Sequence, residues 1–168
     1  MRGPSGEHGV CVTLAVIVVI AVGGLEAHVA RANVGFVVSA HFGWKVDESS
    51  KGNACAVASA DRCRPAVPSH SAGGFIYPGS VATDPRTGNI YVADIDNYRV
   101  QEMTAAGAFL SMFGWDVNKT KDRQRGATQA EKNVCTAASG DLCTAGVPGT
   151  AAGQLSYPSS VAVDPVTG

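Results

Sequence analysis

Short apolar segments separated by turn residues occupy the middle of the chain. Four of them span residues 81–84, 89–94, 99–103 and 108–113, and most are rich in β-branched and aromatic side chains. Asp, Asn, Pro and Gly gather between them. Short runs of this composition, bounded by turn residues, are typical of β-strands. The pattern therefore predicts four antiparallel strands that follow one another in a meander.

The turn after the first predicted strand indicates how the chain folds back on itself. Residues 84–88 read Asp-Pro-Arg-Thr-Gly. An Asp carboxylate accepts hydrogen bonds from turn amides, Pro presets φ, and Gly closes the turn. An isolated meander leaves two faces and two edge strands open, so it must stack on other copies of itself. Radial stacking of four-stranded meanders gives a β-propeller, and we therefore expect an all-β fold.

A separate apolar run lies near the N-terminus. Residues 10–22 are thirteen positions without a charge. A membrane-spanning helix needs about 20 apolar residues, whereas the core of a secretory signal peptide needs roughly 7–15. Ala30-Arg31-Ala32 offers small side chains for cleavage. We expect a helical signal peptide over residues 1–32 and a secreted or cell-surface protein; the alternative is an uncleaved N-terminal anchor.

The chain contains an internal repeat. Residues 42–44, Phe-Gly-Trp, recur at 113–115 with an offset of 71. Residues 53–63 recur with an offset of 80, and so do residues 77–88. The change of offset places nine extra residues in the polar stretch 118–133, where an insertion costs little. Repetition of this kind points to a fold assembled from stacked units.

Sequence motifs between residues 77 and 101 resemble those of a known family. They include Tyr-Pro-Gly-Ser-Val-Ala-Thr-Asp at 77–84, Asn-Ile-Tyr-Val-Ala-Asp at 89–94 and Arg-Val-Gln at 99–101. Residues 74–113 resemble one nearly complete NHL repeat, and residues 153–168 resemble the opening third of another. The cysteine-bearing inserts are similar to those of exported bacterial NHL proteins.

The resemblance implies a partial β-propeller, with one complete four-stranded antiparallel blade and parts of two neighbours. NHL repeats form propeller blades, and most of these propellers serve as binding platforms. In that family the positions of Asp84, Gly88, Asp94, Asn97 and Arg99 brace turns and neighbouring strands. We expect the same structural role for these residues here.

The expected organisation has six parts. They are a signal peptide (1–32), an outer strand of a neighbouring or closing blade (33–42), a disulfide-containing insert (43–80), a complete blade (81–113), a second disulfide-containing insert (114–160) and the start of the next blade (161–168). The sequence stops before the strand that would match residues 90–93, so we expect a fragment that lacks the C-terminal blades of the same chain. The alternative is a small two-blade protein that forms a dimer.

Four cysteines remain after signal cleavage, and their spacing repeats. Cys55 and Cys63 are eight positions apart, as are Cys135 and Cys143, whereas Cys11 lies in the predicted signal peptide. In an exported chain this spacing predicts one disulfide within each insert. The inserts are then either solvated decoration or the rim of a ligand-binding face, and the sequence leaves both interpretations open.

The sequence offers no persuasive set of catalytic or metal-binding residues. The mature histidines are His41 and His70, and neither recurs in the second unit, so a zinc site is not expected. Motifs for a serine nucleophile, a metalloprotease or a phosphate loop do not occur. The basic residues of 119–125 have acidic neighbours and predict a solvated loop, and Asn118-Lys119-Thr120 is a glycosylation sequon if export is eukaryotic. We expect no catalytic residue, metal or cofactor.

Composition and charge narrow the function classes further. Lys and Arg total 13 and Asp and Glu total 14, so the net charge is −1, whereas a nucleic-acid-binding protein needs a basic face. We expect a binding scaffold for an unknown protein, peptide or glycan, with no nucleic-acid partner and no membrane contact after signal cleavage. The alternatives are a propeller enzyme of the lyase or lactonase type with a channel-bound metal, and an extracellular sensor domain.

Overall fold

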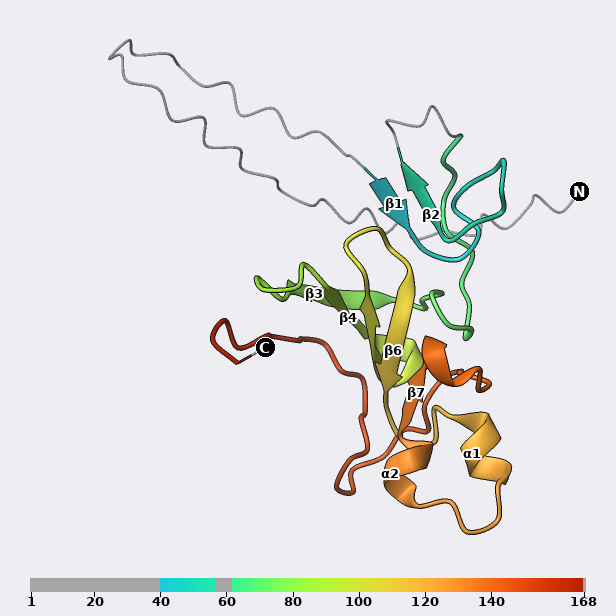
Figure 1. Cartoon of the computed structure of the whole chain (residues 1–168), viewed down its shortest axis with the longest axis vertical. Helices are drawn as coiled ribbons and strands as arrows, with labels where there is room; N and C mark the ends of the chain where they lie inside the picture. Colours follow the sequence, from blue (N-terminus) through green and yellow to red (C-terminus); the bar gives the residue numbers. More distant parts are fainter. Residues whose placement is uncertain (1–39, 57–61, 168) are drawn as a thin grey trace, which may run out of the picture.

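The computed structural model describes residues 40–56 and 62–167, which form two antiparallel β-sheets (Figure 1). Strands β1 (Ala40–Phe42) and β2 (Ala54–Ala56) make the smaller sheet. The predicted signal peptide and the first part of the predicted outer strand lie outside the described residues. Within those residues, no helix is long and apolar enough to cross a membrane.

The larger sheet holds five strands in the order of the sequence. They are β3 (Pro78–Thr83), β4 (Ile90–Asp94), β5 (Arg99–Met103), β6 (Phe109–Phe113) and β7 (Val134–Thr136). Single 3₁₀ turns, η2 (Ile95–Asn97) and η3 (Ala137–Ser139), follow β4 and β7. The first four strands confirm the predicted antiparallel meander, although β3 begins earlier than expected, at Pro78.

The turn between β3 and β4 has the chemistry that its sequence predicts. Asp84 is buried, and its carboxylate accepts hydrogen bonds from the Arg86 amide at 2.9 Å and the Thr87 hydroxyl at 2.7 Å. Gly88 closes the turn with φ of 74°, a conformation that favours a residue without Cβ. These contacts fix the reversal that brings β4 antiparallel to β3.

Strand β7 was not expected, because it comes from the predicted second insert. It pairs with the outer strand of the meander in the register Ser111↔Thr136, Met112↔Cys135 and Phe113↔Val134. Part of this insert therefore extends the sheet and is more than surface decoration. Three residues inside a polar stretch are too short a run to show strand periodicity.

The first insert repeats this arrangement. Strand β1 pairs with β2 so that Phe42 lies opposite Ala54, as Phe113 lies opposite Val134. The backbone bond from Val67 to the Trp44 carbonyl likewise recurs between Val147 and Trp115. We call residues 42–68 and 113–148 the first and second cysteine modules. The internal repeat found in the sequence is thus a repeat of structure.

The nine extra residues of the second module belong to a stretch that folds into two short helices, α1 (Lys119–Arg123) and α2 (Gln129–Lys132). Helix α2 begins with a capping box in which Thr128 and Glu131 each bond to the other's backbone amide. Both helices lie at the end of the molecule away from β1 and β2 (Figure 1). The basic stretch predicted as a solvated loop is therefore largely helical, and its helical residues are not buried.

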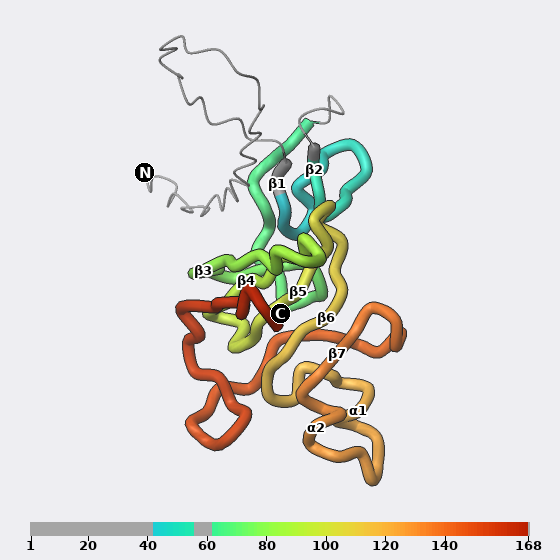
Figure 2. The backbone as a smooth tube through the Cα atoms, turned by 60° about the vertical axis from the view of Figure 1, so that its left-hand side comes forward, coloured from blue at the N-terminus to red at the C-terminus, as the bar shows by residue number. Residues whose placement is uncertain are grey.

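Two apolar clusters hold the parts together. In the first, Phe42 packs against a face of the large sheet made by Ile90, Val92 and Met103. In the second, Met112 and Val117 pack around the second disulfide. Figure 2 shows the small sheet of β1 and β2 lying over the end of the large sheet near the β5–β6 turn. Each cysteine module therefore contributes to a core.

Replacing Cys135 and Cys143 together by Ala should lower the free energy of unfolding by about 2–3 kcal/mol, because the crosslink restricts a short loop in the unfolded chain. Urea denaturation of the disulfide-bonded chain measures the loss. Ala137→Ser is the matched control, since it changes the same exposed loop and leaves the crosslink in place. Equal stability of the double variant and the control would contradict a structural role for this disulfide.

Candidate functional site

Three of the predicted bracing residues meet at one end of the large sheet. Asp94 ends β4, Asn97 lies in η2 and Arg99 begins β5, and all three are fully buried, as is Gln101. Arg99 Nε lies 2.9 Å from Asp94 Oδ2, and Asn97 donates to the same oxygen at 2.8 Å. We call these four residues the buried brace.

The buried brace holds the backbone of the segment that leads from the first cysteine module into β3. The Arg99 guanidinium donates to the carbonyls of His70 at 2.7 Å and Gly74 at 2.7 Å. Gln101 donates to the Gly74 carbonyl and accepts from the Gly73 amide. A segment with little apolar content is thereby fixed by side chains of the sheet.

The charge pair at the centre of the buried brace has been removed from water. Burial raises the pKa of the Asp94 carboxyl, while the neighbouring Arg99 charge and the Ile76 and Asn97 donors act in the opposite direction. Burial likewise lowers the pKa of Arg99, and Asp94 opposes that shift. Within the described part of the chain, no buried side-chain polar atom lacks a hydrogen-bond partner. Removing either Asp94 or Arg99 would therefore leave the other charge buried without a partner and destabilise the fold.

The remaining predicted bracing residues lie elsewhere. Asp84 and Gly88 belong to the β3–β4 turn, at the opposite end of the strands from the buried brace. The backbone amide of Arg86 and the hydroxyl of Thr87 lower the pKa of the Asp84 carboxyl. The bracing residues thus form two separate structural sites and not one convergent polar cluster.

Three tyrosines gather at the end of the sheet that holds the buried brace. Tyr77 and Tyr157 are 60% and 59% exposed, and they occupy equivalent positions in the two units. The rings of Tyr98 and Tyr157 meet edge to face, with centroids 5.3 Å apart and planes at 74°. We call Tyr77, Tyr98, Tyr157 and the exposed Asp96 the tyrosine end.

Three segments distant in sequence converge at the tyrosine end. The Asp96 amide donates to the Ile76 carbonyl at 3.2 Å, which places η2 against the start of β3. A Cβ added to Gly79 would lie 3.3 Å from the Ser159 carbonyl, which places the C-terminal segment beside the same strand. The Tyr-Pro pair at 77–78 repeats at 157–158 in the sequence, but no local pattern predicts this surface, because Tyr98 joins it only through folding.

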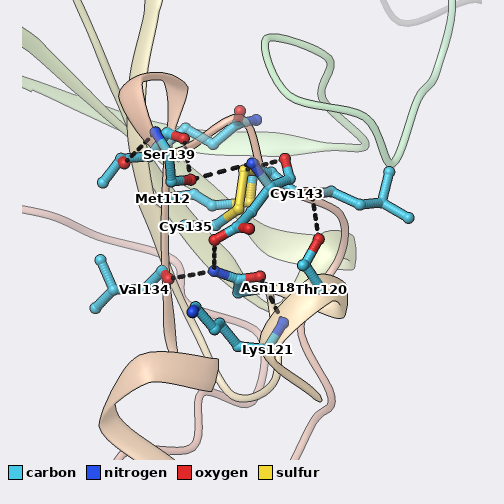
Figure 3. The surroundings of a disulfide bond; sticks show 12 residues. Met112, Asn118, Thr120, Lys121, Val134, Cys135, Ser139 and Cys143 are labelled. Carbon is cyan, nitrogen blue, oxygen red and sulfur yellow. Dashed lines mark hydrogen bonds between the residues drawn. A yellow bond between two sulfur atoms is a disulfide. The ribbon is translucent and has the colours of Figure 1, made fainter. Parts of the chain in front are cut away.

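Disulfides link Cys55 to Cys63 and Cys135 to Cys143, in agreement with the predicted pairing. Figure 3 shows the second disulfide beside Met112, with Asn118 below it. Asn118, the first residue of the sequon, is 3% exposed and donates to the Val134 carbonyl and the Asp141 carboxylate. Its side chain organises the module and is not accessible for modification in the folded chain.

The described residues offer little for metal chemistry. They include no group of three or more His, Cys, Asp or Glu side chains that could hold a metal ion.

A scan against protein-family models finds no match to this chain, and a search of curated proteins finds no significant relative. The structure does provide a surface that a ligand could contact, which is the tyrosine end. This surface lies at the end of the large sheet where the second cysteine module begins.

Replacing Arg99 by Met should destabilise the chain by about 3–5 kcal/mol, because the change leaves Asp94 buried without its partner and frees the carbonyls that Arg99 holds. Arg86→Met is the control, because Arg86 is half-exposed and lies 3.8 Å from Asp84. It should change stability by no more than about 0.5 kcal/mol. Urea denaturation compares the two, and similar losses would contradict the central role of the buried pair.

Proposed function

We propose that this chain is part of an exported NHL-type β-propeller that acts as a binding scaffold for a protein, peptide or glycan. Strands β3 to β6 form one blade in this proposal. The cysteine modules belong to the outer part of successive blades, and ligand contacts are made at the tyrosine end.

The observation that carries the proposal is the packing of Phe42. This residue ends a strand of the first unit, yet its ring is buried against Ile90, Val92 and Met103 on the sheet of the next. Gly107 permits this contact, since a Cβ there would collide with the Phe42 ring. Packing of one unit on the face of the following unit is the contact from which stacked-sheet folds are built.

The second unit offers the same surface again. Phe113 and Val134, the equivalents of Phe42 and Ala54, are 37% and 42% exposed. Both lie on the face of the large sheet opposite to Val92 and Met112, so a further unit could pack there as the large sheet packs on Phe42.

The C-terminal segment is consistent with the start of such a unit. It runs alongside β3 in the same direction, with Val161 donating to the Ser80 hydroxyl and Arg86 donating to the Val166 carbonyl. Parallel neighbouring first strands are what adjacent blades of a propeller require. Of the residues expected to begin the next blade, 161–164 are not paired as a strand and 165–167 form a turn.

Two features support export and binding. Two disulfide bonds are compatible with an extracytoplasmic location. The tyrosine end presents aromatic rings to solvent, and exposed tyrosines are common in surfaces that recognise ligands.

Incubating the exported chain with printed panels of peptides and glycans tests the function. We expect saturable binding to members of at least one panel, with loss of binding in the Arg99→Met variant. Absence of saturable binding on both panels would contradict the scaffold proposal.

Phe42→Ala tests the stacking. We expect a loss of about 3–5 kcal/mol in the free energy of unfolding, because the ring fills the space between two units. Phe113→Ala is the matched variant at the equivalent position and should cost less than about 1 kcal/mol in this chain, since Phe113 is partly exposed. Urea denaturation measures both losses. A small loss in the free energy of unfolding for Phe42→Ala would contradict the proposed stacking of the two units.

A further inference from the structure

We propose that the tyrosine end binds the cationic side chains of an extended peptide, with Tyr98 and Tyr157 contacting a Lys or Arg side chain and Asp96 neutralising its charge. The proposal rests on the binding-scaffold function and names the ligand class for that surface.

The backbone at the tyrosine end is the first reason to regard these rings as functional. Tyr77, Tyr98 and Tyr157 adopt φ of 55°, 51° and 51°, in the left-handed region that disfavours residues with a Cβ. Glycine would adopt this conformation without cost. Tyr77 and Tyr157 are about 60% exposed, so burial of their rings does little to offset the strain. Residues held in this conformation are common where ligands bind.

The geometry of the rings fits a cation. The edge-to-face contact of Tyr98 and Tyr157, at 5.3 Å, sets two ring planes nearly at right angles at one corner. A cation is attracted to the face of an aromatic ring within about 6 Å of its centre. With Tyr157 mostly exposed, a ligand side chain can reach this corner from solvent.

The negative charge of Asp96 favours a positively charged ligand side chain at this corner. Asp96 is exposed, and its carboxylate makes no ion pair or side-chain hydrogen bond with any residue in the described ranges. The nearby cation Arg99 is buried and already paired with Asp94. The contact with Tyr157, then burial, and least the charge of Asp96 raise the pKa of the Tyr98 phenol, so the Asp96 charge acts at this corner of the surface. A carboxylate or phosphate ligand would be repelled, and a neutral sugar could donate hydrogen bonds to Asp96 but would not neutralise its charge.

The repeat argues for an extended ligand. Tyr77 and Tyr157 occupy equivalent positions in consecutive units, and the segments that carry them run in the same direction. A peptide with repeated basic residues can contact both.

Isothermal titration calorimetry of the exported chain tests the proposal with three probes. They are a capped (Gly-Lys)4 peptide, the matched (Gly-Glu)4 peptide and chitotetraose. We expect binding of the lysine peptide alone, weakened about five- to tenfold by Asp96→Asn and by Tyr157→Gly, the range of a single cation–π or charge contact. Tyr157→Gly relieves the strained backbone while removing the ring, so it should stay folded.

Two controls separate the Tyr157 ring from its hydroxyl and from a tyrosine elsewhere on the sheet. Tyr157→Phe keeps the ring and should retain most of the affinity. Tyr91→Phe changes a tyrosine that bonds Glu102 on the sheet, away from the tyrosine end, and should leave affinity unchanged. Affinity for the lysine peptide that is unaffected by Asp96→Asn and Tyr157→Gly would overturn the proposal.

The remaining outcomes distinguish this proposal from the one on which it rests. Binding of chitotetraose, with none of the lysine peptide, would overturn the cationic ligand and leave the scaffold function standing. Failure of all three probes, together with failure of the peptide and glycan panels, would overturn both.

Discussion

The buried pair of Asp94 and Arg99 is the constraint on which the arrangement of this chain depends. It lies where β4 and β5 are joined by η2, and its remaining hydrogen-bonding capacity is directed at the backbone between the first cysteine module and β3. A buried ion pair contributes little net stability compared with a packed apolar core. Its value here is geometric, because it fixes a polar connection that has few apolar contacts of its own. The tyrosine end takes its shape from the same connection and from η2.

The cysteine modules add long segments to the sheets while keeping part of the polar backbone hydrogen-bonded. Each module pairs a short strand with the preceding outer strand and then crosslinks that strand to the returning chain. The short cross-strand contact between Asn118 and Cys143 recurs between Asp47 and Cys63. The disulfide substitutes for the hydrophobic core that a segment of this size cannot build.

The sequence predicted the meander well, because strands 90–94 and 99–103 carry β-branched residues between recognisable turns. It also predicted the disulfides, since the Cys spacing repeats. It did not predict β7 or α1, whose signals are only three and five residues long. The bracing role of Asp94, Asn97 and Arg99 followed from a family resemblance, whereas the surface formed by Tyr98 and Tyr157 depends on a long-range contact that no local pattern encodes.

The length difference between the two cysteine modules has a practical consequence. Residues 48–52 in one module and 119–132 in the other connect the same pair of landmarks, and the flanking backbone bonds to Asn53 and Asn133 are alike. The frame therefore tolerates loops of different size at this point. It is a natural site for loop grafting, where an epitope or a fluorophore-binding peptide could be installed in either unit while the crosslinked strands beneath it keep their register.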